Sequence, residues 1–195
     1  MKKILSLGLV ASSLFIASTA IGAETYYSDQ GHTEVKFGWS HAGVSMQSGE
    51  FTSVKATLSL DPDNVEQSTI TATIEANSLA SGFGPLDTHL KSADFLEVET
   101  YPEITFTSTS ITKTGDETAD IAGDLTIHGM THPVTLATTM SHRGEHPLGA
   151  YIDYYKGQWV AFTATTSIDH QAFGVGGFST GPISITIITE MKDRE

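Results

Sequence analysis

The chain has 195 residues, of which 23 are acidic and 10 are basic, and it contains no cysteine. Its net charge of −13 opposes binding to nucleic-acid phosphates and to anionic lipid headgroups, so we expect no nucleic-acid partner. Without cysteine there is no disulfide framework, and a stable domain must rely on burial and hydrogen bonds.

The beginning of the chain has the pattern of a secretory signal peptide. Two lysines precede an apolar run over residues 4–16, and small residues lead to Ala23, where we expect cleavage. A membrane anchor is the alternative, but serine and glycine interrupt a run that is already short for a span. We therefore predict a signal peptide, 1–23, and one secreted domain, 24–195. Cleavage after Ala23 would remove both lysines. The remaining 172 residues would carry 8 basic and 23 acidic side chains, a net charge of −15.

From residue 35 onwards the chain repeats a period-two alternation of apolar and polar residues, which is typical of half-buried β-strands. Eight such runs occur, rich in threonine and isoleucine. The residues that share the inward face of each run are, in chain order, Val35, Phe37, Trp39; Val54, Ala56, Leu58, Leu60; Ile70, Ala72, Ile74, Ala76; Ile104, Phe106; Ala119, Ile121, Gly123, Leu125, Ile127; Val134, Leu136, Thr138, Met140; Val160, Phe162, Ala164, Thr166, Ile168; and Ile183, Ile185, Ile187. Turn-forming residues separate several runs, at 61–64, 114–116 and 141–149. This pattern predicts an all-β domain, either an eight-stranded antiparallel barrel or a sandwich.

Many of the inward residues are small, which favours a hollow barrel. They are Ala56, Ala72, Ala76, Ala119, Gly123, Ala164 and Thr166. An eight-stranded barrel has an interior that side chains just fill or that holds one small ligand. With small residues pointing inward, an apolar tunnel suited to a lipid chain would remain. The alternation alone leaves the alternative open, a sandwich whose sheets lie close because these residues are small.

Residues 77–101 lack strand alternation. The four-residue spacing of Asp87 and Lys91 suits a helical turn, so we expect a short helical insert between the third and fourth strands. Two compatible interpretations stay open. The insert is either an apolar flap over the mouth of the barrel or an ordinary connection that packs on its wall.

Three motifs follow one another in the middle of the chain. They read Asp-Thr-His-Leu-Lys-Ser-Ala-Asp-Phe from Asp87, Tyr-Pro-Glu-Ile-Thr-Phe-Thr-Ser from Tyr101, and Gly-Asp-Leu-Thr-Ile-His-Gly from Gly123 followed by Thr-His-Pro-Val-Thr-Leu from Thr131. With these motifs the chain resembles the YceI-like family of periplasmic proteins over about residues 26–191. The resemblance implies a lipocalin-like barrel that binds polyisoprenoid lipids, and it also implies a homodimer.

The chain departs from the commonest pattern of that family at two positions. Leu86 and His170 stand where an arginine is common. A guanidinium group pairs with phosphate through two hydrogen bonds, and neither of these side chains can do so. The departure argues against a diphosphate headgroup and favours a neutral head such as a quinone ring or a fatty acyl amide.

Candidate site residues come from the inward faces, the insert and the family motifs. We expect the apolar cavity and its flap to be formed by Phe37, Trp39, Ala72, Ile74, Leu79, Phe83, Leu90, Phe95, Ile104, Phe106, Phe162 and Phe173. Asp87, His89 and Lys91 are candidate contacts to a polar headgroup, since imidazole and ammonium groups donate hydrogen bonds. The alternative for His89 is a structural role, in which its ring caps the helical turn or bonds a backbone carbonyl.

Eight histidines support a second hypothesis, a metal or pH buffer. His128 and His132, like His142 and His146, have an H-x3-H spacing that places two ligands on one face of a helix. Both segments have the composition of turns, so we expect solvated histidines and no metal site. A metal site would require the two pairs to meet at one rim of the barrel.

No catalytic constellation is apparent in the sequence. There is no G-x-S-x-G elbow and no serine or carboxylate pattern that marks a nucleophile. A lipid isomerase or hydrolase that uses His89 is a third hypothesis.

We expect a protein that is not an enzyme, needs no cofactor, and binds, stores or transports a long-chain polyisoprenoid, polyprenyl or quinone lipid in the periplasm. Its expected partners are that lipid, a second copy of the chain and, transiently, proteins or lipids of the inner membrane. The alternative function is a periplasmic stress protein that uses its histidines as a metal or pH buffer.

Overall fold

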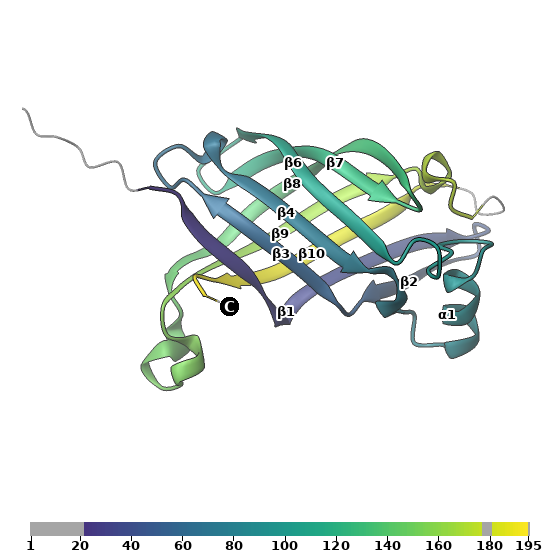
Figure 1. Cartoon of the computed structure of the whole chain (residues 1–195), viewed down its shortest axis with the longest axis horizontal. Helices are drawn as coiled ribbons and strands as arrows, with labels where there is room; N and C mark the ends of the chain where they lie inside the picture. Colours follow the sequence, from purple (N-terminus) through teal and green to yellow (C-terminus); the bar gives the residue numbers. More distant parts are fainter. Residues whose placement is uncertain (1–21, 177–180, 195) are drawn as a thin grey trace, which may run out of the picture.

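The computed structural model describes residues 22–176 and 181–194. The expected signal peptide, 1–23, lies almost wholly outside the described residues and stays a prediction. Within them the chain forms an antiparallel barrel with a short helix near one end (Figure 1). No helix in these ranges is long and apolar enough to cross a bilayer.

Ten strands form the sheet in the described residues, and eight of them close a ring. Their bounds are β1 Glu24–His41, β2 Ser45–Phe51, β3 Val54–Leu60, β4 Thr69–Glu75, β5 Leu79–Ala80, β6 Glu103–Lys113, β7 Thr118–Ile127, β8 Met130–Glu145, β9 Gln158–Ile168 and β10 Ile183–Lys192. The ring runs β1-β3-β4-β6-β7-β8-β9-β10 and closes because β10 pairs with β1. Neighbouring strands of the ring are antiparallel. The predicted eight-stranded antiparallel barrel is confirmed.

The helices are short and lie between strands. They are the α-helix α1 Gly84–Lys91 and the 3-10 helices η1 Val65–Gln67, η2 Ala76–Ser78, η3 Pro147–Ala150, η4 Asp153–Tyr155 and η5 His170–Phe173. α1 lies between β4 and β6, so the predicted helical insert between the third and fourth barrel strands is confirmed. Pro85 in its first turn costs no hydrogen bond there and has a φ suited to a helix start.

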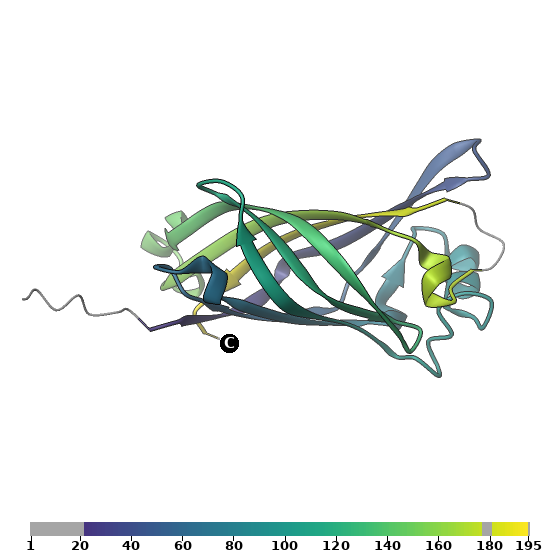
Figure 2. The same cartoon turned by 90° about the horizontal axis from the view of Figure 1, so that it is seen from above.

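β1 is longer than the alternation around Val35 predicts, and it pairs with two strands along the same side. Residues 24–27 pair with β3, whereas residues 35–41 pair with β2. Neither β2 nor the two-residue β5 is predicted by the alternation, because residues 45–50 are polar or small apart from Met46. The β1–β2 hairpin extends beyond the ring at the end of the barrel where α1 also lies (Figure 2).

β8 extends further along the chain than the sequence predicts. β8 continues to Glu145, so the turn expected over residues 141–149 is wrong for its first five residues. The register of β8 against β9 shifts between Met140 and His142, and pairing then resumes up to Gln158. Such a bulge accommodates an extra residue without ending the strand.

A tight hairpin joins β7 to β8. Its two-residue turn is His128–Gly129, with φ of 52° and 72°. Positive φ at both positions matches the right-handed twist of the two strands. A Cβ on Gly129 would lie 2.7 Å from Cε1 of Tyr101, so glycine is also needed for the close approach of that ring.

Apolar packing closes the end of the barrel opposite α1. Five side chains there are at most 4% exposed, and they are Tyr26, Leu58, Leu60, Val160 and Met191. Full burial of side chains of this size contributes about 1.5–3 kcal/mol each to folding. A second cluster, which includes Phe106, Leu125 and Phe173, surrounds the interior nearer α1.

A buried carboxylate attaches the η3–η4 segment to the closed end. Asp29 accepts hydrogen bonds from the Tyr154 hydroxyl and from Nδ1 of His32, the latter at 2.5 Å, and Nζ of Lys192 lies 3.9 Å away. Burial alone would raise the pKa of Asp29, but these hydrogen bonds and the nearby cationic groups outweigh it and hold the pKa below its usual value. The hydrogen bond from Tyr154 to Asp29, together with burial, raises the pKa of Tyr154 to about 12.

Candidate functional site

The barrel encloses an apolar cavity of about 660 Å³. Small-molecule sites in proteins occupy about 300–1,000 Å³, so the volume suits a ligand. Alternate residues of the barrel strands form its wall, because successive side chains of a strand point to opposite faces. Along β10, for example, Ile185 and Ile187 line the cavity, whereas Ser184 is exposed. The interior is therefore hollow, which decides against the sandwich.

The cavity extends from α1 to the closed end of the barrel. Leu90 of α1 lines it at one end, and Met191 of the closed-end cluster lines it at the other. Deep inside, the buried hydroxyls of Thr33 and Thr189 lie 2.8 Å apart and hydrogen-bond each other. No aspartate, glutamate, lysine or arginine stands among the described residues that line the cavity. The site is suited to an uncharged, largely apolar molecule.

Aromatic side chains gather on the β1–β2 hairpin where it lines the cavity. The rings of Phe37 and Trp39 are stacked with centroids 5.8 Å apart, and Phe51 lies 5.3 Å from Phe37. A Cβ on Gly49 would lie 2.6 Å from Cζ of Phe37, so the glycine makes room for that ring. β2 thus contributes to the site although the alternation does not predict it.

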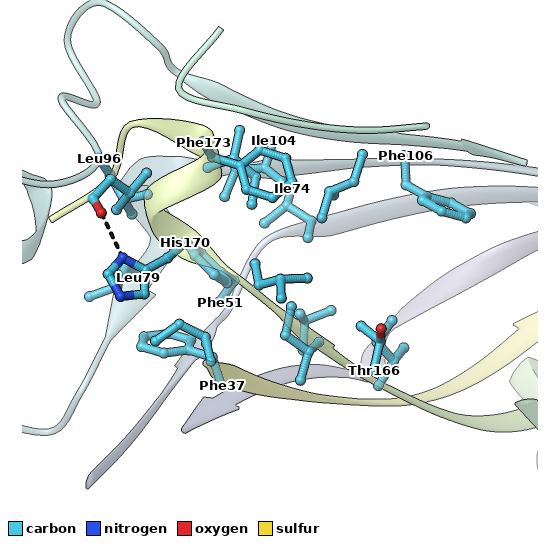
Figure 3. A pocket seen from close by; sticks show the side chains of 18 of the residues that line it. Phe37, Phe51, Ile74, Leu79, Leu96, Ile104, Phe106, Thr166, His170 and Phe173 are labelled. Atoms are coloured by element: carbon cyan, nitrogen blue, oxygen red, sulfur yellow. Dashed lines mark hydrogen bonds between the residues drawn. The ribbon is translucent and has the colours of Figure 1, made fainter. Parts of the chain in front are cut away.

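Ten of the twelve predicted apolar site residues line the cavity. They are Phe37, Trp39, Ala72, Ile74, Leu79, Leu90, Phe95, Ile104, Phe106 and Phe173. Figure 3 shows several of them around the same interior, with Leu79 and Phe37 towards one side and Phe106 towards the other. The structure therefore brings together residues from both halves of the chain and from the insert.

The other two predicted apolar residues lie outside the cavity. Phe83 precedes α1, and 63% of its surface is exposed, because the helix begins one residue later and turns its ring towards solvent. Phe162 lies on the inward face of β9 but packs against the closed-end cluster, beyond the reach of the cavity.

The three predicted headgroup contacts separate in the structure. His89 lines the cavity, where its ring meets the edge of Phe95 with centroids 5.0 Å apart. Asp87 does not line it. Its Oδ1 accepts hydrogen bonds from the backbone amide of Ser81 at 2.7 Å and from the Ser81 hydroxyl at 2.5 Å, and these bonds lower the pKa of Asp87. Lys91 lies outside the lining as well.

Several lining residues were not singled out by the sequence. Phe51 ends β2 opposite Val35, and Leu96 follows α1. His170 is noted in the sequence only as a departure from the family pattern, yet this residue is 6% exposed and lines the cavity. No spacing or composition signals its burial, because η5 and the following residues form an irregular loop that folds back over the end of β9.

The two histidine pairs do not meet. His128 lies in the β7–β8 turn and His132 near the start of β8, whereas His142 and His146 lie at the opposite end of β8. The distance along the strand prevents all four from reaching one ion. No group of three or more metal-ligating side chains with suitable geometry occurs in residues 22–176 and 181–194.

Each pair contacts other side chains. Nε2 of His128 lies 3.3 Å from a carboxylate oxygen of Glu97, and its ring lies 4.4 Å from that of Tyr101. The His146 ring stacks on Tyr155 with centroids 4.4 Å apart. The histidines are therefore parts of local packing, and the expectation that they are merely solvated is too simple.

Comparison with known proteins places the chain in a family. A model of the YceI-like domain matches residues 26–191. A UPF0312 protein of Pseudomonas putida is 37% identical over 178 residues, which cover 91% of this chain and 89% of the relative. The protein YceI of Salmonella arizonae is 40% identical over 150 residues, which cover 76% and 78%.

Solved structures show the same fold. BcnA of Burkholderia cenocepacia superposes with a TM-score of 0.71 at 23% identity, covering 84% of this chain and 98% of that one. A polyisoprenoid binding domain from Saccharophagus degradans superposes with a TM-score of 0.61 at 10% identity, covering 87% and 98%. At these identities the structural likeness supports the fold alone. Together with the domain match and the sequence relatives, it shows that the chain belongs to the YceI-like family.

Proposed function

We propose that the protein binds one long-chain lipid of the isoprenoid or quinone class inside the barrel, and that it carries or stores this lipid in the periplasm. The observation that carries the proposal is the uncharged, apolar cavity of about 660 Å³ that runs from α1 to the closed end. The polyisoprenoid binding named for the domain of Saccharophagus degradans supports the choice of ligand class.

Burial of the lipid chain supplies the driving force. Each CH₂ group removed from water contributes about 0.8 kcal/mol. Association costs about 4–15 kcal/mol in lost freedom of motion, so a chain of several isoprene units offsets this cost with little polar recognition. Affinity would then depend mainly on the chain, and the headgroup would decide which lipid of a given length is preferred.

A binding role without catalysis agrees with the composition of the wall. The titratable side chains among the described lining residues are His41, His89 and His170. Of these, His89 has a carboxylate oxygen of Asp94 3.4 Å away, but both side chains are more than half exposed. An exposed pair of this kind is weak, so Asp94 does not fix the orientation of the His89 ring as a general base would require. The homodimer and the contact with the inner membrane stay predictions.

Mass spectrometry of the gently purified protein tests the proposal. The protein is isolated from periplasm without detergent, and we expect a fraction of molecules to carry one non-covalent apolar lipid, recovered by organic extraction as a polyprenyl compound or a quinone. N-terminal sequencing of the same preparation should begin at Glu24, one residue after the expected cleavage. Repeated preparations without lipid, together with failure to load the delipidated protein with polyprenols and quinones, would contradict the proposal.

A further inference from the structure

The tip of the β1–β2 hairpin exposes apolar side chains beyond the ring of the barrel. Val44 is 83% exposed and Met46 is 70% exposed. The hairpin extends past the ring at the end where α1 lies, and Phe83, which is 63% exposed, directly precedes that helix (Figure 2). Single exposed apolar residues are ordinary, but these three stand on the two elements that lie at one end of the cavity.

The cavity opens at this hairpin. His41, the last residue of β1, and Ala42, in the turn that follows, line the cavity and are at the same time exposed to solvent. Val44 comes two residues later, in the same turn. The opening of the cavity and the apolar tip of the hairpin are therefore adjacent parts of one surface.

The same surface lacks charge, although the protein as a whole carries −13. Neither residues 37–49, which form the hairpin tip, nor residues 76–86, which contain the start of α1, include an aspartate, glutamate, lysine or arginine. The closed end also exposes a large ring, that of Tyr151, but Asp153 and Lys156 are exposed charges close to it in the chain. Transfer of a charge into an apolar phase is costly, so of the two ends only the open one suits such a phase.

The backbone of β2 limits how deeply the tip can enter an apolar phase. β5 pairs with β2 only at Glu50 and Phe51, so along residues 45–48 one edge of β2 has no strand beside it in the described part of the chain. Open sheet edges are not tolerated in the hydrocarbon core of a bilayer. Asp87 adds a charge in the first turn of α1. The surface therefore suits shallow contact at the headgroup boundary, where amphipathic elements bury their apolar face about 5–10 Å deep.

We infer that the open end of the barrel docks on the surface of a zwitterionic bilayer through Val44, Met46 and Phe83, and that the lipid moves between bilayer and cavity at this contact. The inference rests on the proposed function and names the partner of the same site. A long chain that crossed water instead would expose its apolar surface, at a cost that grows with every CH₂ group. Because the protein is acidic, anionic headgroups oppose docking.

Two single-cysteine variants locate the contact, since the natural chain contains no cysteine. Val44→Cys carries an environment-sensitive fluorophore at the hairpin tip. Tyr151→Cys carries it at the closed end, where the native side chain is equally exposed, at 85%. When phosphatidylcholine vesicles are added, we expect the emission of labelled Val44→Cys to rise and shift to shorter wavelength, and that of labelled Tyr151→Cys to stay unchanged. Replacing part of the lipid by phosphatidylglycerol should weaken the response.

A transfer experiment tests whether the contact serves lipid exchange. Phosphatidylcholine vesicles loaded with geranylgeraniol are mixed with delipidated protein, and the alcohol that remains with the protein after the vesicles are pelleted is measured over time. Uptake by the wild type should become faster as the vesicle concentration rises. In Val44→Ser/Met46→Ser/Phe83→Ser it should be at least roughly tenfold slower and independent of vesicle concentration, because the alcohol must then cross water.

Two controls separate docking from binding. None of the three substituted side chains lines the cavity, so the triple variant should bind geranylgeraniol supplied from ethanol within about twofold of the wild-type affinity. Tyr151→Ser/Ile152→Ser removes exposed apolar side chains from the closed end and should take up the alcohol from vesicles at the wild-type rate.

The outcomes distinguish the inference from the function on which it rests. Equal uptake from vesicles by the triple variant and the wild type, or a vesicle response at position 151 in place of position 44, would overturn the inference, while lipid binding itself would stand. A response of labelled Val44→Cys to unlabelled protein without vesicles would assign the surface to a second copy of the chain and would overturn it as well. If geranylgeraniol supplied from ethanol does not bind, the proposed function fails.

Discussion

At the scale of single residues, Asp29 shows how a barrel with a hollow interior keeps its closed end in place. Its carboxylate receives hydrogen bonds from Tyr154, 125 positions later in the chain, and from His32, three positions later. Lys192 of the last strand lies beside it. One buried side chain therefore joins β1, η4 and β10, and the charged form is favoured by all of its partners.

Replacing Asp29 by asparagine tests this arrangement. Hydrogen bonds to a charged group contribute about 1.5–3 kcal/mol, so we expect Asp29→Asn to lower the free energy of unfolding at pH 7 by about that amount. The pKa of Asp29 is depressed in the folded protein, so its contribution is present above the unfolded pKa of about 3.9 and is lost as the pH falls further through the folded pKa. Urea denaturation between pH 3 and pH 7 should show the wild type and the variant converging at the acidic end.

Asp120→Asn is the matched control, because Asp120 is an exposed acid on an outward face of β7. It should change stability by less than about 0.5 kcal/mol. Equal losses in the two variants, or a difference for Asp29→Asn that does not depend on pH, would show that the buried carboxylate has no special role.

Single residues were predicted well where a strict period governs them. Ala72, Ile104 and Phe106 reach the cavity because every second residue of a strand faces the same side. Phe162 obeys the same rule and still misses the ligand space, because alternation gives the face and not the height along the barrel. Asp29 was not singled out, since nothing in the sequence near it indicates a partner more than a hundred residues away.

At the scale of elements, α1 is held at the cavity by a side chain that looked like a ligand contact. The helix has eight residues and none of them is buried. Isolated helices of this length are unstable in water, so tertiary contacts must hold it. Asp87 supplies one of them by accepting two hydrogen bonds from Ser81, which precedes the helix. The insert was predicted from its missing alternation, but this role of Asp87 was not.

Asp87→Ala should loosen the insert without unfolding the barrel. The substitution removes both hydrogen bonds that tie the helix to Ser81, so hydrogen exchange at the amides of residues 84–91 should become several-fold faster. The midpoint of global unfolding should hardly move. Asp94→Ala is the control, because Asp94 is an exposed acid of the same insert whose pair with His89 is weak. Comparable acceleration in both variants would mean that the bonds to Ser81 do not hold the helix.

β2 marks the limit of prediction at this scale. The residues of β2 are mostly polar and small, and the β1–β2 hairpin extends beyond the ring. The first four residues of β2 are therefore all exposed, without any alternation. Periodicity appears in a sequence only where one face of a strand is buried and the other is not. A strand without a buried face therefore leaves no signal, although its last residue, Phe51, lines the cavity.

At the scale of the whole molecule, the barrel and its hollow interior were predictable, but the volume of the void was not. Eight alternating runs and three family motifs predict the closed antiparallel ring. The volume inside depends on the tilt of the strands and on the positions of large rings such as Phe106. Neither can be deduced from the sequence of a single strand. Gly123 illustrates this, because a Cβ there would lie 2.4 Å from Cζ of Phe106, so the ring occupies space that only a glycine leaves free.

Filling the void from one position tests whether it is a ligand site or a packing defect. Ala72 lines the cavity and pairs across the sheet with Ala56 on one side and Phe106 on the other. Overpacking a solid core costs about 1–3 kcal/mol, whereas a ring that enters an existing cavity has room. We therefore expect Ala72→Phe to change the urea midpoint of the delipidated protein little. Displacing at least two ligand CH₂ groups should cost about 1.6 kcal/mol, so geranylgeraniol should bind at least roughly tenfold more weakly.

The neighbouring residue provides the control with the same side chain on the opposite face. Thr71 is exposed and pairs with Thr57 and Thr107, so a phenylalanine there points into solvent. Thr71→Phe should leave both the unfolding midpoint and the fluorescence titration with geranylgeraniol unchanged. If Ala72→Phe instead unfolds the empty protein while its folded fraction binds the lipid normally, position 72 belongs to a packed core. The ligand would then have to lie elsewhere in the barrel, because a ring at the middle of β4 cannot share the space that the lipid chain is proposed to fill.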